Sequence, residues 1–190
     1  MQDESHRETL ARGWQYHQAG DLQAAAQAYR HVLEDDLGVG NAWHLLGRVC
    51  FQQGDSRQAV EYMRQAIVHE PNNAAFHHNL GLVHVSRGAL SDAAACFQEA
   101  IRLQPDYADA YVNLGNIYFA RKQVNEAIDS YRRALAVRPN YSLAAQNLLN
   151  ALNAREDPDE NLAYWLLARD SSAELQKKRS ALTATFIERG

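Results

Sequence analysis

The sequence is poor in the features on which most enzyme and metal sites depend. Its two cysteines, Cys50 and Cys96, are too few for a disulfide framework and form no CxxC pair. It contains no glycine-rich phosphate loop, GxSxG elbow or HExxH motif. The acidic residues are scattered along the chain and do not suggest an acid–base pair. We therefore expect no enzyme activity, no cofactor and no metal site.

Charge and hydropathy argue against two further classes of protein. The net charge is −4 and the pI is about 6.0, which does not favour a general binder of nucleic acids or anionic membranes. No apolar run approaches the roughly 18 residues of a membrane helix. Residues 1–5 are acidic and polar, unlike a secretory signal. These observations predict a cytoplasmic protein with no nucleic-acid partner and no membrane insertion.

The sequence does contain an internal repeat with a period of 34 residues. Leu-Gly pairs recur at 46–47, 80–81 and 114–115. Several independent series share this register, which excludes coincidence. They are Gly13, Gly47, Gly81 and Gly115; Ala25, Ala59, Ala93 and Ala127; Tyr29, Met63, Phe97 and Tyr131; and Pro71, Pro105 and Pro139.

This pattern resembles the tetratricopeptide repeat family, whose signature runs W-x2-L-G-x2-Y and continues with Ala, an aromatic residue and Pro. The chain reads Trp43-x2-Leu46-Gly47 in one unit and Tyr111-x2-Leu114-Gly115-x2-Tyr118 in another. The resemblance implies an all-α fold, a right-handed α-solenoid of stacked antiparallel helix hairpins. We predict a single solenoid over 1–190, with repeats at 6–39, 40–73, 74–107 and 108–141, a degenerate fifth repeat at 142–175, and a capping helix at 172–189.

The repeated residue types suit two closely crossing helices. A glycine on the first helix and an alanine on the second let the backbones approach. Large side chains such as Trp43, Tyr111, Phe97 and Tyr131 are expected to fill the gaps between neighbouring hairpins. Helix-start residues fit the same scheme. Asn72-Asn73, Asp106 and Asn140 are expected to precede first helices, and Ser91 and Asn125 second helices.

The family resemblance also implies where a ligand would bind, because first helices line the concave face of such a solenoid. We expect a protein-interaction scaffold that holds a peptide or a helix in this groove. Trp14, Phe51, Leu82, Val112 and Phe119 would be apolar groove residues that a monomer has little reason to expose. The residues predicted to bind the peptide are Trp14, His44, Arg48, Phe51, His78, Asn79, Leu82, Val112, Asn113, Asn116, Phe119 and Asn147.

Three asparagines at one repeat position form the most specific feature of this groove. Asn79, Asn113 and Asn147 each offer a donor and an acceptor, so they could pair with the backbone of an extended peptide. The ladder resembles that of the repeat domain of O-linked N-acetylglucosamine transferase. Asparagine is also common at this position in tetratricopeptide repeats, so a purely structural role remains an alternative.

The histidines are open to two interpretations. His44 and His78 share the fifth position of their repeats and should project toward one surface. Adjacent histidines such as His77 and His78 face different ways on a helix, and no carboxylate completes a metal-ligand set. Solvated or ligand-contacting histidines are therefore favoured over a metal site.

The same repeats bear on three other functions. A chaperone-tail receptor would need basic residues where this chain has Leu10 with Ala75 and Asn79, or His44 with Asp109 and Asn113, so it is disfavoured. The segment 146–153, followed by 157–160, resembles the junction between repeats and catalytic region in bacterial relatives of the transferase. The chain could thus be the substrate-presenting scaffold of a larger glycosyltransferase-like protein. Self-association is the third alternative, with residues 172–189 of the same or a neighbouring chain in the groove, making a homo-oligomer.

Overall fold

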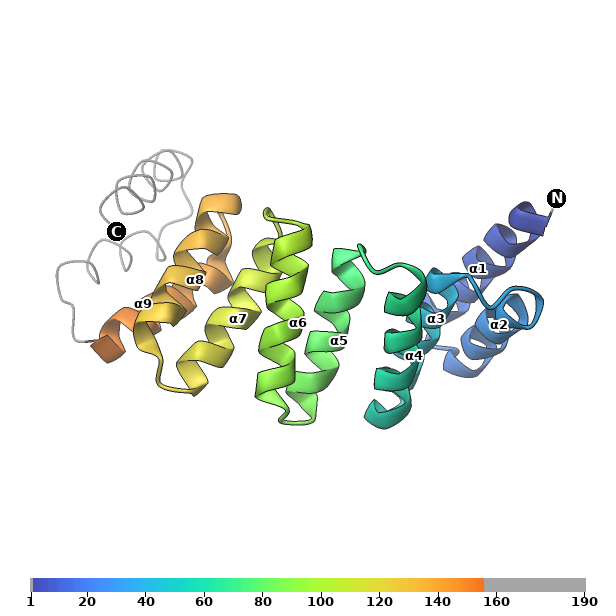
Figure 1. The fold of residues 1–190 in the computed structure, drawn as a ribbon, viewed down its shortest axis with the longest axis horizontal. Helices are drawn as coiled ribbons and strands as arrows, with labels where there is room; N and C mark the ends of the chain where they lie inside the picture. The colour runs from blue at the N-terminus through green and yellow to red at the C-terminus, as the bar shows by residue number, and fades with distance from the viewer. Residues whose placement is uncertain (1, 156–190) are drawn as a thin grey trace. The chain divides into compact units, whose positions relative to one another are not determined.

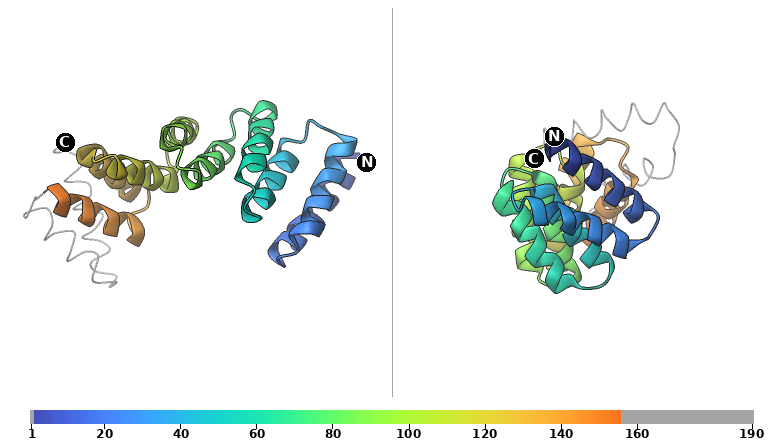
Figure 2. Two further views of the ribbon diagram at one scale, coloured as in Figure 1. Left: turned by 90° about the horizontal axis from the view of Figure 1, so that it is seen from below. Right: turned by 90° about the vertical axis from the view of Figure 1, so that its right-hand side faces the viewer.

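The computed structural model describes residues 2–155, and these residues form nine α-helices and no strand. Figure 1 shows that consecutive helices pair as antiparallel hairpins, and Figure 2 shows the same pairing from two other directions. The all-α hairpin fold is therefore confirmed. The helices are α1 (Gln2–Gln18), α2 (Leu22–Asp35), α3 (Gly40–Gln52), α4 (Ser56–His69), α5 (Ala74–Ser86), α6 (Leu90–Leu103), α7 (Ala108–Ala120), α8 (Val124–Val137) and α9 (Ser142–Arg155).

The chain divides into two compact units, Met1–Leu103 and Gln104–Gly190. In the first unit α2 packs against α3 and α4 against α5, which joins three hairpins. In the second unit α7 and α8 form a hairpin, and α9 packs on α8. The single solenoid over 1–190 stays a prediction. So do the rest of the degenerate repeat and the capping helix at 172–189, which lie outside the described residues.

Four of the five predicted first helices begin where the repeat numbering places them, at Gly40, Ala74, Ala108 and Ser142. The exception is α1, which begins at Gln2 rather than at His6. Glu4, near the start of α1, suits the positive end of the helix dipole.

The tight packing inside each hairpin follows from the glycine series. A Cβ on Gly115 would lie 2.6 Å from Cε1 of Tyr131, and a Cβ on Gly81 would lie 2.6 Å from Cε1 of Phe97. The expectation that these two rings fill gaps between hairpins is therefore incomplete, because each fills the space beside the glycine of its own hairpin. All four alanines of the repeat series are fully buried, at 0% exposure: Ala25, Ala59, Ala93 and Ala127.

The turns inside the hairpins contain a second periodic feature that the repeat pattern alone did not reveal. Gly20, Gly54 and Gly88 have φ values of +81°, +86° and +71°, and they are 34 residues apart. Lys122 occupies the same place in the fourth hairpin, with φ of +61°. This turn needs a left-handed residue, which glycine adopts without a steric penalty and lysine does not.

The caps of the second helices differ from the prediction. Ser91 and Asn125 lie inside α6 and α8, one residue after the helix begins, so they are not the caps. The side chains of Asp21 and Asp55 cap α2 and α4 by accepting hydrogen bonds from Ala24 N and Gln58 N at 3.0 and 2.9 Å.

The residues expected before first helices do precede α5, α7 and α9, and one of them makes a side-chain cap. Asn73 caps α5 by accepting from Ala75 N at 3.2 Å. Asp106 is not a cap, because Tyr107 is the N-cap of α7 and makes no side-chain cap hydrogen bond.

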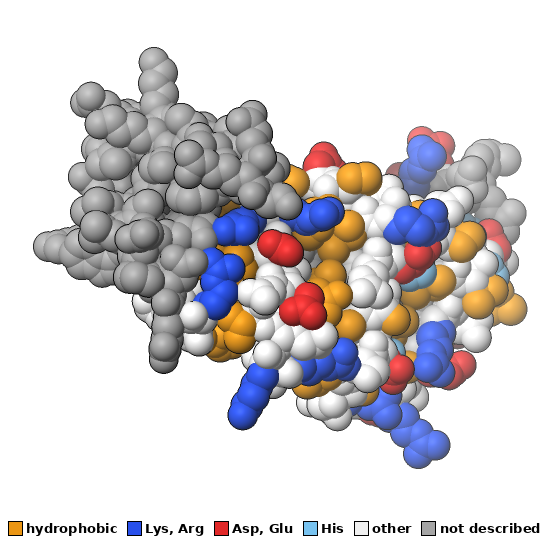
Figure 3. Space-filling view, turned by 60° about the vertical axis from the view of Figure 1, so that its left-hand side comes forward, with side chains coloured by type: hydrophobic (Ala, Val, Ile, Leu, Met, Phe, Trp, Pro, Cys, Tyr) orange, Lys and Arg blue, Asp and Glu red, His pale blue; other side chains and the backbone are white. Residues whose placement is uncertain are grey.

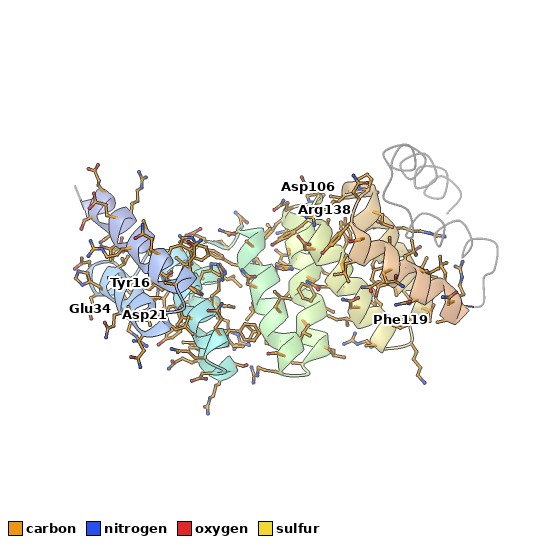
Figure 4. All side chains as sticks on the ribbon, turned by 180° about the vertical axis from the view of Figure 1, so that it is seen from behind. Tyr16, Asp21, Glu34, Asp106, Phe119 and Arg138 are labelled. Atoms are coloured by element: carbon orange, nitrogen blue, oxygen red, sulfur yellow. The ribbon has the colours of Figure 1, made fainter. Side chains whose placement is uncertain are left out.

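In the second unit an ion pair fixes the start of α7 to the turn before α9. The Asp109 carboxylate accepts two hydrogen bonds from the Arg138 guanidinium, both at 3.2 Å, and a third from the Tyr141 hydroxyl. Figure 4 labels Arg138 at this end of the hairpin. The contact orients α7 and α9, whose side chains build the site described next.

Candidate peptide-binding surface

In the first unit, Trp14 and Arg48 come together on the surface of the first helices. The Arg48 guanidinium carbon lies 5.1 Å from the centroid of the Trp14 ring, a cation–π arrangement. Trp14 is 37% exposed and also meets the edge of the His17 ring at 5.5 Å. The structure therefore brings together Trp14 of α1 and Arg48 of α3, which the sequence analysis placed on the first helices of consecutive repeats.

His17 links α1 to α3 within the same surface. Its Nε2 lies 2.7 Å from the Oε1 of Gln52, to which it donates. Burial lowers the pKa of His17, the hydrogen bond to Gln52 opposes that shift, and the nearby Arg48 charge adds to it. His17 is thus a neutral bridge between two hairpins.

His44 lies inside the stack of hairpins. Its side chain is only 6% exposed, its ring stacks on Phe76 at 4.5 Å, and its Nε2 accepts a hydrogen bond from Asn79 Nδ2 at 2.7 Å. Burial, and secondarily the Arg48 charge, lowers the pKa of His44 to about 4. His44 is therefore a neutral acceptor whose partner is the next first helix.

The expectation of solvated histidines is wrong for His44 and His78. His78 is 8% exposed, and its ring lies 5.5 Å from that of Phe97. The prediction that Val112 is an exposed groove residue is also wrong, because Val112 is 1% exposed. These three residues share the fifth repeat position, and the contacts of His44 show that this position faces the following first helix rather than the solvent.

The asparagine ladder is part of the packing in at least two places. Asn79 donates to His44, and Asn147 Nδ2 donates to Asn116 Oδ1 at 2.8 Å. Asn113 is half-buried, as are Phe51, Leu82 and Arg48. In both of these pairs the ladder asparagine donates its side-chain amide to the preceding first helix.

The second unit contains a pocket of about 200 Å³ on its first-helix surface. Phe119, labelled at the end of α7 in Figure 4, is 37% exposed in its wall. Of the predicted binding residues, Asn116, Phe119 and Asn147 meet here. The pocket is lined by Asn116, Phe119, Ala120, Tyr131, Asn147 and Asn150.

One carbonyl oxygen organises this pocket. Asn116 Oδ1 accepts hydrogen bonds from both the Tyr131 hydroxyl and Asn147 Nδ2, each at 2.8 Å. Burial raises the pKa of Tyr131 to about 12, so its hydroxyl remains a donor. The repeat pattern assigned Tyr131 to packing alone, and its polar role could not be anticipated because it depends on a partner 15 residues away.

No metal-binding or membrane-spanning feature occurs in the described part of the chain. Residues 2–155 contain no group of three His, Cys, Asp or Glu side chains placed to hold a metal ion. None of the helices within the same range is long and apolar enough to cross a membrane.

Burial raises the pKa of the Cys96 thiol to about 11 and also raises that of Cys50. On the face in Figure 3, basic and acidic side chains of the described residues are interspersed.

These hairpins define a helical-repeat protein, and the comparisons identify its family. Two profiles described as tetratricopeptide repeat match residues 16–82 and 78–142. The chain belongs to the tetratricopeptide repeat family. No curated protein matches the sequence.

Solved structures share the fold at low sequence identity. A crystal structure of MamA has a TM-score of 0.75 and 24% identity, covering 91% of this chain and 96% of that one. A structure of pilF from Pseudomonas aeruginosa has a TM-score of 0.80 and 20% identity, covering 99% and 92%. A chain of the APC/C hetero-tetramer Cut9-Hcn1 has a TM-score of 0.70 and 22% identity, covering 77% of this chain and 30% of that chain.

Proposed function

We propose that this chain is a non-enzymatic protein-binding scaffold that holds an extended peptide segment on its first helices. The observation that carries the proposal is the pocket beside Asn116, where three predicted binding residues converge. One structural neighbour is a chain of a hetero-tetramer, so this fold takes part in a complex between different proteins in at least that case.

The hydrogen-bonding groups of the pocket complement a peptide backbone. Asn116 uses its carbonyl oxygen for Tyr131 and Asn147, and its amide hydrogens donate to no atom of residues 2–155. Asn147 uses its amide and keeps its carbonyl oxygen as an acceptor. One peptide unit offers one acceptor and one donor, so these two side chains can bind it whatever its sequence.

The size and lining of the pocket also suit a peptide. About 200 Å³ is less than the roughly 300–1,000 Å³ of pockets for small molecules and cofactors. The Phe119 ring and the Ala120 methyl supply apolar contact, which would favour one small or medium side chain of the bound segment.

A blocking substitution tests this proposal. Peptides are first selected on the immobilised full chain from a random 12-residue phage library, and their Kd values are then measured by fluorescence polarisation. Ala120→Arg fills the pocket without removing any hydrogen bond between side chains. We expect it to weaken binding at least about tenfold, which corresponds to about 1.4 kcal/mol.

The matched control is Ala136→Arg, because Ala136 is an exposed alanine of α8 that does not line the pocket. It adds the same side chain and the same charge, and we expect Kd to stay within about twofold of the wild type. Failure to select any peptide, or equal weakening by both substitutions, would contradict the proposal.

A further inference from the structure

The first unit contains a larger pocket that includes none of the predicted binding residues. Its volume is about 450 Å³, and it lies where the end of α2 and the following loop meet α3 and α4. Most of its lining is apolar or aromatic, and Glu34, labelled in Figure 4, stands at its rim. The lining residues are Arg30, Leu33, Glu34, Leu37, Trp43, Leu46 and Tyr62.

The wall of this pocket is rigidly built. Trp43 Nε1 donates to the Leu37 carbonyl oxygen at 2.8 Å, and the Trp43 ring lies 5.6 Å from the Tyr62 ring at 33°. Asp36 Oδ1 accepts from Gly38 N at 2.8 Å, which holds the loop. Because both the loop and the indole are held, the pocket is preformed and binding would not require ordering them.

The loop departs from the repeat in a way that exposes apolar surface. Leu37 stands at the repeat position occupied by Pro71 in the next hairpin, and it is 63% exposed. His77, at the position equivalent to Trp43, makes the same kind of bond to the Pro71 carbonyl oxygen at 2.9 Å. The backbone contact is therefore shared by both hairpin junctions, whereas the large indole and the exposed leucine distinguish the first junction from the second.

The charges around the pocket favour a basic occupant. Glu34, Asp35 and Asp36 follow one another at the end of α2, where the helix dipole is already negative and where α2 has no basic residue in its last turn. Glu34 lies 3.5 Å from His31, and Asp35 lies 3.7 Å from His6. Of these three carboxylates Glu34 lines the pocket, as does Arg30, and Asp35 and Asp36 follow it in the chain.

We propose that this pocket binds a segment of a partner protein that inserts one aromatic side chain and places a lysine or arginine beside Glu34. The aromatic ring would pack against Leu37, Leu33 and the Trp43–Tyr62 pair, and the basic group would offset the charge at the end of α2. This second binding surface lies in another unit from the pocket beside Asn116, so it does not depend on the function proposed above.

The test uses three short synthetic peptides and the full ¹⁵N-labelled chain. The probes are acetyl-Ser-Phe-Lys-Lys-Ser amide, its acidic counterpart with two glutamates, and its anchorless counterpart with alanine for phenylalanine. Binding is followed by the indole N–H cross-peak of Trp43, assigned by comparison with Trp43→Phe. At low ionic strength the basic Phe peptide should move this cross-peak saturably, with a Kd at least threefold lower than that of either counterpart.

Charge-changing variants separate site binding from general attraction. Glu34→Lys should raise the Kd of the basic peptide at least threefold, and Arg30→Glu should lower it. Glu8→Lys makes the same change in net charge on an exposed residue of α1 and should leave the Kd within about twofold. Leu37→Ser removes an exposed side chain, keeps the backbone carbonyl, and should weaken binding.

An unmoved Trp43 cross-peak would overturn the proposal. So would equal binding of the basic and acidic peptides, or an equal effect of Glu34→Lys and Glu8→Lys.

Discussion

The contact between Gly115 and Tyr131 allows a quantitative prediction for Gly115→Ala. The added Cβ would lie 2.6, 2.8 and 3.0 Å from Cε1, Cδ1 and Cζ of the Tyr131 ring. Carbon atoms in contact prefer about 3.5–4.0 Å, so the methyl group overlaps the ring by about 1 Å. The ring cannot easily move, because Tyr131 is buried and its hydroxyl is bonded to Asn116.

Two opposing effects set the size of the change. Overpacking a closely packed core costs about 1–3 kcal/mol, and replacing glycine by alanine inside a helix returns about 1 kcal/mol. Because the Tyr131 ring is held in place, we take the overpacking cost as about 2–3 kcal/mol, the upper part of that range. We therefore expect Gly115→Ala to lower the free energy of unfolding by about 1–2 kcal/mol. Gly47→Ala should also destabilise the chain, because its Cβ would lie 2.9 Å from Cγ of Met63 and 3.2 Å from the backbone carbonyl oxygen of Ala59.

Urea denaturation followed by circular dichroism at 222 nm measures these changes. Arg133→Ala, on the exposed side of α8, is the control and should stay within about 0.5 kcal/mol of the wild type. In a double-mutant cycle, Tyr131→Leu should cost less when Gly115→Ala is present, because the smaller side chain relieves the overlap. If Gly115→Ala is neutral or stabilising, the reasoning about this helix crossing is refuted.

Four further predictions concern single residues. Because His44 has a pKa of about 4 in the folded chain against 6.5 for the free group, the unfolded chain binds its proton more tightly. The free energy of unfolding should therefore fall as pH drops from about 6.5 to about 4, and His44→Gln should flatten that fall by on the order of 3 kcal/mol. Cys96, with a pKa of about 11, should react slowly with a disulfide reagent at pH 8 and rapidly after denaturation. Lys122→Gly should raise the midpoint of urea unfolding, adding about 0.5–1 kcal/mol by relieving φ of +61°. Asp55→Ala removes the cap of α4 and should cost about 1 kcal/mol in the same assay, whereas an unchanged midpoint would mean that the cap does not contribute.

Much of the architecture could be predicted from spacing alone. A series such as Ala25 and Ala59 marks positions where only a small side chain fits, and the structure buries every member of it. The starts of α3, α5, α7 and α9 followed from the same register. Spacing succeeds here because the packing of two helices within a hairpin depends on residues about 16 positions apart, and every repeat contains the same pairs.

The details of the candidate sites were less predictable. The repeat position of His44 predicted an exposed imidazole, but Phe76 and Asn79 of the next first helix cover it. The sequence did not predict Asp55 as the cap of α4. It predicted that Ser91 and Asn125 would precede second helices, but they lie one residue inside α6 and α8. Such errors arise because the local sequence does not specify two things. The residue that caps a helix depends on the backbone angles at the helix start, and the burial of a side chain depends on residues of a neighbouring helix.

The sequence by itself determined that this chain is a tetratricopeptide repeat protein, where four of its first helices begin, and which small residues let the two helices of a hairpin approach. That Phe97 and Tyr131 lie beside the glycine of their own hairpin was decided only by the tertiary structure. Only the tertiary structure decided that Asn116 accepts from both Tyr131 and Asn147, leaving an amide for a ligand. It likewise decided that Leu37 and Trp43 enclose a pocket at the first junction. The physical reason is that spacing determines which residues share a helix face, whereas hydrogen-bond partners and pockets depend on how neighbouring hairpins pack in three dimensions.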